Sequence, residues 1–344
     1  MKKIKYKAKV LAKTFFGEES RLDKLSKLGD RLLKLNSQVN WDIFRPLLEK
    51  NLYKVNEFGG RPPYDYILMV KILILQRYYN ISDDEIEYQL NDRLSFQRFL
   101  NLSLDDDIPD AKTIWNFREQ LKKKNLIKKL FRLFLKEIQS NGLIGKKGVM
   151  VDASFVEVPI QRNSKDENKE IRNGRIPNWE NKNKRRQKDI EASWTKKNDQ
   201  KYFGYKNHVK ADKKSKIILD YGITPASVHD SMPVECLLSE KDDKGQSFFG
   251  DSAYVGPRIE KILKKFKMKN KIIEKGYRNR PLTKKQIKRN KKKSSTRVRV
   301  EHIFGFIENS MGGSFMRSIG LSRADANIGL MNLTYNMFRS LQIS

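Results

Sequence analysis

The chain has 344 residues, enough for about two domains, and 38% of them are hydrophobic, so it can bury a core and is not a disordered tail. Lysine and arginine number 72 against 41 acidic residues, which gives a formal charge of +31 and makes a polyanion the natural partner: DNA, RNA or an anionic membrane. Cys236 is the only cysteine, which excludes an internal disulfide and a cysteine-based zinc site.

Two stretches bear on a membrane location. The densest apolar run, Tyr66–Tyr79, contains Lys71 and is too short for the ~20 residues that a span requires. The first twenty residues scatter lysines among the apolar side chains, a pattern that predicts no signal peptide. We therefore expect a cytoplasmic, nucleoid-associated protein with nucleic acid, and not a membrane, as its partner.

Residues 1–145 read as an all-helical N-terminal domain. Tyr66–Tyr79 predicts a buried helix, and Ser82 opens a second helix with a capping-box pattern. Asp110 is a candidate N-cap for a third helix, and Leu126–Ile138 forms a basic amphipathic fourth. The helices after Ser82 and Asp110 fit either a DNA-reading helix-turn-helix or a hairpin that only builds the core.

Residues 146–344 change to a mixed pattern of strands and helices. Lys147–Ile160 alternates as a strand does, and Tyr202–Ser227 reads as a hairpin whose turn is Asp212–Ser215. Between them, residues 161–201 are polar and basic and predict an inserted loop. Its aromatic residues Trp179 and Trp194 fit either packing against the domain or stacking on an unpaired base.

The remaining elements alternate in type. We predict helices at Val228–Glu240, Gly256–Met268, Arg297–Asn309 and Arg323–Leu341, and strands at Gln246–Tyr254 and Asn270–Gly276. Antiparallel strands followed by crossover helices indicate an α+β or α/β domain with a mixed sheet and flanking helices.

Three acidic residues lie at the ends of elements or inside them. Asp152 lies within a strand, Asp251 ends another, and Glu301 is on a helix. Carboxylates placed this deep are costly unless they are paired or hold a cation, and a divalent ion would remove their mutual repulsion. Two Mg²⁺ ions held by such acids can activate a nucleophile and stabilise a leaving oxygen at a phosphodiester. Composition alone does not select these three, since Asp220, Asp230 and Glu157 occupy similar places.

The selection comes from a resemblance. "GGRPPYDYILMVKILILQRYYNISDDEIEYQLNDRLSFQRFL" is similar to the N-terminal helical domain of the DDE transposases of the bacterial insertion sequence five group. "VDASFV", "YFGYKNHVKAD", "YGITPASVHDS", "FFGDSAYVG" and "RVRVEHIFGFIEN" resemble the catalytic blocks of that group, in the same order. The resemblance covers nearly the whole chain.

The resemblance implies a ribonuclease H-like catalytic domain with a DDE motif. It places the first acid on the first strand, at Asp152, the second after the fourth strand, at Asp251, and the third on a later helix, at Glu301. The spacings of 99 and 50 residues are compatible with that layout. The implied activity is Mg²⁺-dependent cleavage at the ends of the mobile element, with Mn²⁺ as a substitute, followed by strand transfer of the 3′-hydroxyl. The implied partners are terminal inverted repeats and target DNA, bound by a homodimer.

Several residues are candidates for contact with DNA or for an accessory role. The basic run before Glu301 and one strand lysine supply the DNA-binding candidates Lys206, Lys291, Lys292, Lys293, Arg297 and Arg299. His208 and His302 are possible accessory bases, although His208 fits a packed strand residue and His302 points about 100° from Glu301. The pattern departs from relatives at Ser294 and Glu308, where they carry Tyr and Lys.

Three other readings of the chain stay open. A catalytically inactive or repurposed DNA-binding protein would keep the basic surface and lose metal-dependent cleavage. A nuclease that cuts without joining would share the acids. An RNA-binding structural protein would show no preference for inverted-repeat DNA.

Overall fold

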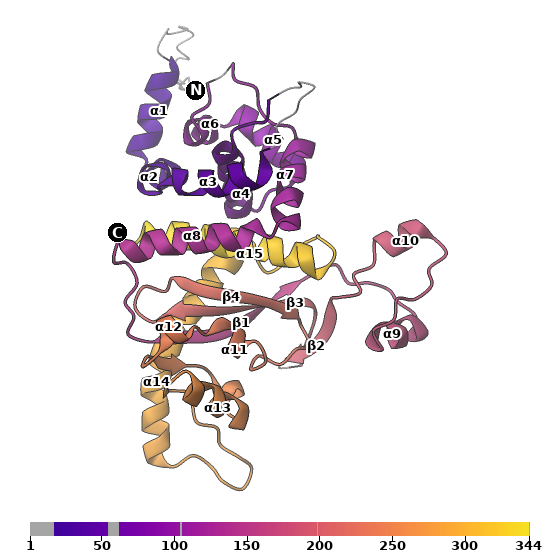
Figure 1. The fold of residues 1–344 in the computed structure, drawn as a ribbon, viewed down its shortest axis with the longest axis vertical. Helices are drawn as coiled ribbons and strands as arrows, with labels where there is room; N and C mark the ends of the chain where they lie inside the picture. Colours follow the sequence, from indigo (N-terminus) through magenta and orange to yellow (C-terminus); the bar gives the residue numbers. More distant parts are fainter. Residues whose placement is uncertain (1–16, 54–61, 104, 198, 344) are drawn as a thin grey trace, which may run out of the picture.

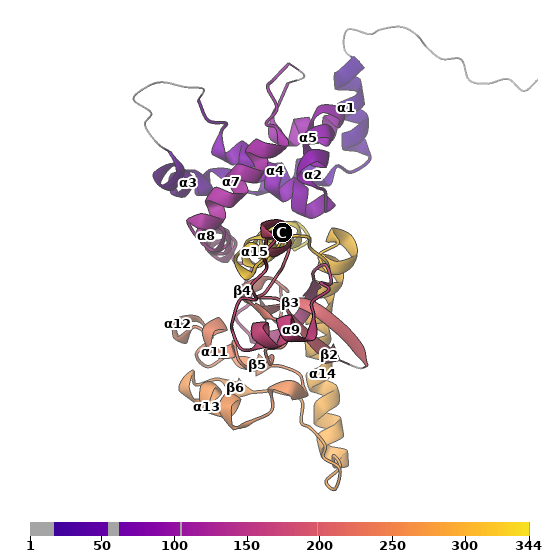
Figure 2. The ribbon, with the colours of Figure 1, turned by 90° about the vertical axis from the view of Figure 1, so that its right-hand side faces the viewer.

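The computed structural model describes residues 17–53, 62–103, 105–197 and 199–343, and Figures 1 and 2 show it from two sides. The first 16 residues, on which the signal-peptide prediction rests, lie outside the described part. The chain up to residue 140 is helical, with no strand in its described residues. Its helices are α1 (Gly17–Lys27), α2 (Arg31–Gln38), η1 (Trp41–Phe44), α3 (Arg45–Leu52), α4 (Tyr66–Tyr79), α5 (Asp83–Asp92), α6 (Leu94–Leu100), α7 (Ala111–Lys123) and α8 (Leu126–Ser140).

Side-chain caps start these helices where the sequence predicts them. The Ser82 hydroxyl accepts from the Glu85 N–H to begin α5, and the Asp110 carboxylate accepts from the Thr113 N–H to begin α7. α4 is apolar on nearly every side and is buried, as predicted. Its one lysine, Lys71, is satisfied inside the core, because its Nζ donates to Asn36 Oδ1 at 2.8 Å and to the Phe99 carbonyl at 3.3 Å.

The close pair of helices that would suggest a helix-turn-helix is not formed. α6 intervenes between α5 and α7, so the two predicted helices are not joined by a tight turn. Ile86 and Leu90 on α5 and Ile114 and Leu121 on α7 are all buried in the same core. This burial favours the core-forming reading of the pair.

The second part of the chain is built on a six-stranded mixed sheet. Its strands are β1 (Val149–Glu157), β2 (Ser193–Lys197), β3 (Gln200–Asp212), β4 (Ile218–Pro225), β5 (Ser247–Phe249) and β6 (Lys269–Asn270). β3 is antiparallel to β1, β2 and β4, whereas β5 lies parallel to β1 and β6 parallel to β5. β1 is therefore central, with the antiparallel strands on one side and the parallel pair on the other.

Helices cover this sheet and extend beyond it. They are α9 (Lys165–Arg172), α10 (Lys182–Arg186), α11 (Val234–Leu237), α12 (Glu240–Asp243), α13 (Pro257–Lys265), α14 (Lys284–Gly305), the π-helical turn η3 (Phe306–Ser310) and α15 (Leu321–Ser340). α11 to α13 lie along one side of the sheet. The C-terminal part of α14 packs on β1 and β5, and its N-terminal part projects away from the body (Figure 2). α9 and α10 stand out from the sheet on their own arm (Figure 1).

The C-terminal helix α15 joins the two parts of the chain. It lies beside α8, between the helical region and the sheet (Figure 1), and one continuous hydrophobic core runs from α2 through α15 to the sheet. Buried amides fix it: Asn332 and Asn207 on β3 exchange hydrogen bonds of 2.9 and 3.1 Å, and Asn336 bonds both backbone groups of Ile218. The helical region and the sheet are thus packed on the same helix.

The insertion is more ordered than the predicted loop. It holds α9 and α10, and its last residues form β2, a strand that the sequence did not predict. Buried Asp189 anchors it, accepting from the Tyr205 hydroxyl on β3 and from the Gly320 N–H before α15. Trp179 is buried with its Nε1 donating to Glu167 at 2.6 Å, whereas Trp194 on β2 is 46% exposed. Packing is therefore correct for Trp179.

Three further sequence predictions need correction. Val228–Glu240 is not one helix, because Leu238 is extended and separates the one-turn helices α11 and α12. The strand predicted over Asn270–Gly276 ends at once, since the Asn270 side chain accepts from the Ile272 N–H. The helix predicted to begin at Arg297 begins earlier: Thr283 and Gln286 form a capping box that starts α14 thirteen residues before the predicted helix.

The fold class predicted from the sequence is confirmed. A helical region precedes a ribonuclease H-like sheet in which four strands joined by antiparallel pairing, β1 to β4, continue through helical crossovers into two parallel strands. In the residues that the structure describes, no helix combines the length and apolar character needed to cross a bilayer.

Candidate active site

The pairing of β1 with β5 sets the two aspartates level with each other. Val149 pairs with Phe248 and Met150 with Phe249, so partners are 99 positions apart, as Asp152 and Asp251 also are. The same register, extended past the last pair, brings Asp152 and Asp251 to the same height at the end of β5. Because alternate residues face opposite sides of a strand, both carboxylates share the face of Met150 and Phe249.

Asp152 is a largely enclosed carboxyl with few compensating contacts. Its side chain is 15% exposed, and among the described residues its Oδ1 accepts only from the Ala153 N–H at 2.9 Å. Burial, with a smaller contribution from the nearby Asp251 carboxylate, raises its pKa to about 6, against the opposing effects of the Ala153 N–H hydrogen bond and of the Arg297 and Lys197 charges. Asp251 caps the short turn η2 (Ser252–Tyr254) by accepting from the Ala253 N–H, which fixes its direction at the strand end.

α14 brings the third acid to the same face of the sheet. Glu301 lies one turn after Arg297, and the Arg297 guanidinium donates to the Glu301 carboxylate while lying 3.6 Å from Asp152 Oδ2. Glu301 is 52% exposed, so its carboxylate is at the rim of the site and Asp152 is at the bottom. The arginine therefore bridges two of the three predicted catalytic acids.

The two aspartates fit a divalent cation. Asp152 is buried next to another carboxylate, an arrangement whose repulsion a cation relieves. Over the described ranges, no three His, Cys, Asp or Glu side chains are grouped closely enough to hold a metal ion. The Glu301 carboxylate is engaged by Arg297. Mg²⁺ takes one or two protein carboxylates and completes its shell with water and phosphate oxygens, which matches this pair.

Two predicted residues lie on the other face of the sheet. His208 pairs with Ala153 and Lys206 with Phe155, positions that alternate with Asp152 along β1. His208 is fully buried, its Nε2 is 2.8 Å from Thr224 Oγ1, and burial lowers its pKa to about 4. Lys206 is also buried and forms an ion pair of 2.7 Å with Asp230. Neither side chain is brought to the aspartates.

The other candidates lie along α14 and differ in their surroundings. Lys291, Lys292 and His302 are exposed. Lys293 points inward and donates to the Ile272 carbonyl at 2.8 Å and to Glu274 at 3.1 Å. Arg299 is exposed and donates to the Lys213 carbonyl. The exposed ammonium groups are therefore those on the outer side of the helix.

Sequence reasoning missed two residues near Asp152. Lys197 on β2 lies close enough to lower the pKa of Asp152. No sequence pattern distinguished it from the other basic residues of the insertion. Tyr254 is buried three residues after Asp251, with its hydroxyl enclosed and without a hydrogen-bond partner among the described residues. Burial and the carboxylates of Asp152, Asp230 and Asp251 raise its pKa well above the ordinary value. The sequence signal that could have identified Tyr254 was its position three residues after Asp251.

Comparison with known families decides the assignment. Residues 144–337, more than half of the chain, match the family described as "Transposase DDE domain", and residues 20–120 match "Transposase domain (DUF772)". The chain belongs to the DDE transposase family. DDE transposases in general use divalent metal ions, and the family as a whole cleaves and transfers DNA.

This DDE transposase also shows a distant likeness to a solved structure. It is a cryo-EM structure of the piggyBac transposase synaptic complex with hairpin DNA, with 12% sequence identity and a TM-score of 0.41. The match covers 92% of this chain and 73% of that chain. A likeness this remote carries no information on the roles of individual residues.

Proposed function

We propose that this DDE transposase cleaves DNA at the ends of an insertion sequence and joins the freed 3′ ends to target DNA, with Asp152, Asp251 and Glu301 as its catalytic carboxylates. The observation that carries the proposal is the β1–β5 register, which sets Asp152 and Asp251 level on one face. α14 places Glu301 over that face within a domain that matches the family. The insertion sequence five group remains the predicted source.

The reaction proposed is two successive displacements at phosphorus. A water oxygen attacks the phosphodiester at the element boundary, the P–O3′ bond breaks, and the departing 3′ oxygen takes a proton. That 3′-hydroxyl then attacks a target phosphodiester, displacing its own 3′ oxygen and leaving the strand joined. Bound Mg²⁺, or Mn²⁺ in its place, would supply the positive charge that activates the nucleophile and stabilises the leaving oxygen.

The chain's own groups have separate parts in this proposal. Asp152 and Asp251 would hold the cation at the bottom of the site, and Glu301 would complete the set of acids on release of its ion pair with Arg297. Arg297 would then be free to contact a DNA phosphate, since a guanidinium suits bidentate phosphate contact. This exchange uses the ion pair that α14 already holds between positions 297 and 301.

The basic outer side of α14 is the proposed contact with the DNA backbone. Lys291, Lys292 and Arg299 are exposed there, and the helix projects beyond the body of the protein (Figure 2). Lys206 and Lys293 are proposed only as supporting residues, since both ammonium groups are held by the protein. We further propose a homodimer on terminal inverted repeats, because two ends must be cut together, acting on nucleoid DNA in a bacterial cytoplasm.

The test is cleavage and joining of labelled DNA that carries the element's flanking repeats, with Mg²⁺ or Mn²⁺ present. The wild type should nick at the repeat boundary and form joined product, and Asp251→Asn should lose both while still binding the DNA. Binding without cleavage by the wild type would instead establish a repurposed DNA-binding protein. Nicking without joining would identify a nuclease, and equal cleavage by both proteins would remove Asp251 from the mechanism.

A further inference from the structure

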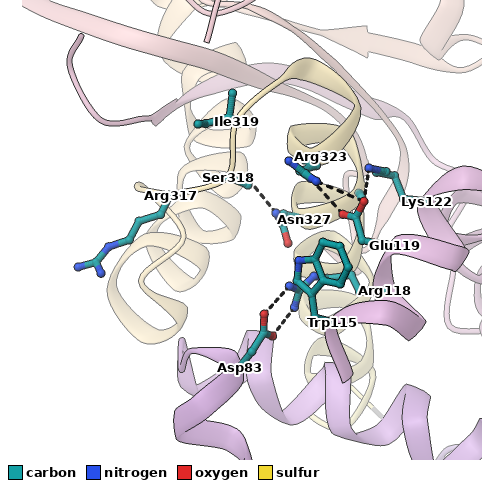
Figure 3. A pocket seen from close by; sticks show the side chains of 11 residues that line it. Asp83, Trp115, Arg118, Glu119, Lys122, Arg317, Ser318, Ile319, Arg323 and Asn327 are labelled. Carbon is teal, nitrogen blue, oxygen red and sulfur yellow. Dashed lines mark hydrogen bonds and ion pairs between the residues drawn. The ribbon is translucent and has the colours of Figure 1, made fainter. Parts of the chain in front are cut away.

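A second concave site lies away from the three acids, at the junction of the helical region with the sheet. It is a pocket of about 420 Å³ between α7 and the segment that leads into α15 (Figure 3). Trp115 and Arg118 line it from α7, and Arg317 and Asn327 from the opposite side. Both parts of the chain therefore contribute to one site.

Most of the charges around this pocket are already paired, but one is not. Arg118 donates to both oxygens of Asp83 at 2.7 Å, and Glu119 accepts from Lys122 and from Arg323 (Figure 3). Arg317 is exposed and forms no ion pair or side-chain hydrogen bond with any described residue. The lining thus carries an excess of positive charge, and the free guanidinium of Arg317 lies at its outer edge, pointing away from Trp115 and Arg118 (Figure 3).

A second guanidinium, half-buried and with its charge only partly compensated, lies behind the pocket. Arg77, near the end of α4, has its Nε fully enclosed, and within the described chain that atom has no acceptor. Asp83 is the carboxylate nearby, and Arg118 already occupies both of its oxygens. Burial and the like charge of Arg118 lower the pKa of Arg77 to about 10. One carboxylate here serves two guanidinium groups.

Packing around the end of α4 explains the position of Arg77, but no neighbouring group fully compensates its charge. The end of α4 is held close to the segment before Arg317, where a Cβ at Gly312 would approach the Asn80 side chain to 2.3 Å. A cavity of about 20 Å³, lined by Arg77 and Asn327, has room for a water molecule. Water satisfies a donor without neutralising a charge, and a buried unpaired charge is costly. An anion in the adjoining pocket would supply the missing charge.

Two other features of the pocket suit a nucleotide rather than a bare ion. Trp115 is 41% exposed, so one part of its indole ring is available to a planar group. The Asn327 amide donates to Ser318 Oγ at 2.9 Å, while its enclosed Oδ1 has no partner in the described chain. Whichever way this amide is turned, one polar atom is left for a ligand.

We propose that this pocket binds a phosphate-bearing nucleotide, with the phosphate at the free guanidinium of Arg317 and the base against Trp115. The proposal rests on the proposed function, in which the ligand is a nucleotide of the bound DNA. The same chemistry is met by a free nucleotide, and the experiment separates the two. The site would fix the DNA at the junction of the helical region and the sheet, away from the reacting phosphodiester.

The test compares Arg317→Gln with Arg132→Gln, which removes another exposed arginine from α8 that forms no ion pair within the described residues. Binding to repeat-end duplex DNA is measured by fluorescence anisotropy over a range of salt concentrations. We expect Arg317→Gln to weaken binding about tenfold and to reduce the slope of log K against log salt by about 0.9, as loss of one phosphate contact does. Arg132→Gln should change neither quantity. Equal effects of the two variants would overturn the proposal, since net charge alone would then explain them.

Arg77→Met supplies an independent readout. Removing a partly compensated charge should raise the melting temperature of the free protein and lower its affinity for DNA. A lower melting temperature with unchanged DNA affinity would mean that Arg77 only supports the fold, and it would overturn the claim that the Arg77 charge favours an anion in the pocket. If millimolar thymidine monophosphate stabilises the wild type and not Arg317→Gln, the pocket accepts free nucleotides; if only DNA does so, the ligand is a phosphate of the chain. If neither ligand distinguishes the two proteins, the pocket binds no nucleotide.

These outcomes are separable from the proposed catalysis. The pocket variants keep all three acids, so the nicking that they retain should still require the metal and occur at the repeat boundary, whereas Asp251→Asn should not nick even when the DNA is saturating. Loss of nicking only in Asp251→Asn, together with weakened binding only in the pocket variants, supports both proposals. Absence of nicking in the wild type would end the catalytic proposal and leave the binding result intact.

Discussion

Arg297 donates to Glu301 and lies 3.6 Å from Asp152, so a single guanidinium occupies the space between two acids assigned to catalysis. In the free protein this cation compensates the carboxylates. Metal binding must therefore compete with it.

Arg297→Gln should bind Mg²⁺ or Mn²⁺ more tightly than the wild type when DNA is absent. The substitution removes the competing cation and leaves the repulsion between the carboxylates less compensated. The free energy of metal binding should therefore be more favourable. We expect an increase of severalfold in affinity, measured by isothermal titration calorimetry near neutral pH. Arg299→Gln is the control, since Arg299 bonds a backbone carbonyl instead of the acids. Weaker metal binding in Arg297→Gln would show that the guanidinium supports the site.

The raised pKa of Asp152 predicts that folding stability and Mg²⁺ affinity both depend on pH. Its pKa is raised from 3.8 to about 6, so between these values the folded protein keeps a proton that the unfolded chain releases. The stability that this carboxyl contributes is complete below about pH 4 and is lost as the pH rises through about 6. Mg²⁺ affinity should change in the opposite sense, rising through about pH 6 and then levelling, because only the carboxylate binds the metal.

Asp152→Asn is the matched control for that pH dependence. The amide does not titrate, so the variant should lose roughly 2–3 kcal/mol less stability than the wild type between about pH 4 and pH 7. Chemical denaturation at several pH values measures this difference. Identical pH profiles for the two proteins would contradict the raised pKa.

Loss of the hydroxyl from Tyr254 and from Tyr205 should change the stability of the fold in different ways. Both rings are buried, but Tyr254 Oη has no partner among the described residues, whereas Tyr205 donates to Asp189 at 2.7 Å. Tyr254→Phe should leave the free energy of unfolding unchanged or raise it by about 1 kcal/mol, and Tyr205→Phe should lower it by about 1–3 kcal/mol. Urea denaturation compares them. Should Tyr254→Phe destabilise the fold as much as Tyr205→Phe, the Tyr254 hydroxyl has a partner in solution, and a bound water or the metal-site acids are the groups at hand.

Neighbouring lysines on α14 should separate DNA contact from fold stability. Lys291→Gln should reduce the slope of log K against log salt by about 0.9 without changing the melting temperature. Lys293→Gln should lower the melting temperature, because it releases the Ile272 carbonyl and Glu274. Anisotropy titrations and thermal melts on both variants test this division. A stable Lys293→Gln with the larger loss of salt dependence would reverse the assignment.

Local patterns predicted most elements of the fold, and the failures have identifiable causes. The caps at Ser82 and Asp110 are local interactions, so their helices were correctly placed. β2 was missed because Ser193–Lys197 is largely polar and gains its strand conformation only by pairing with β3. The early start of α14 was missed since a run of lysines hid the capping box at Thr283.

The candidate site could be predicted in part for similar reasons. Asp152, Asp251 and Glu301 were selected by resemblance to a family, and the structure adds the register that relates the first two. The sequence did not show the register of β3 against β1, which decides which side chains of the two strands share a face of the sheet. His208 and Lys206 were therefore grouped with residues that lie on the other face. Pairing between distant segments decides such questions, and no local pattern contains it.

The register between β1 and β5 also determines which changes of length the domain can accept. The insertion leaves the sheet after β1 and returns to it through β2, so residues can be added to or removed from its arm without shifting the β1–β5 pairing. Deleting one residue between Phe249 and Asp251 would instead turn the second acid to the opposite face of the sheet. The arm can therefore diversify to suit different DNA ends, while the strand ends that hold the acids allow no change in length.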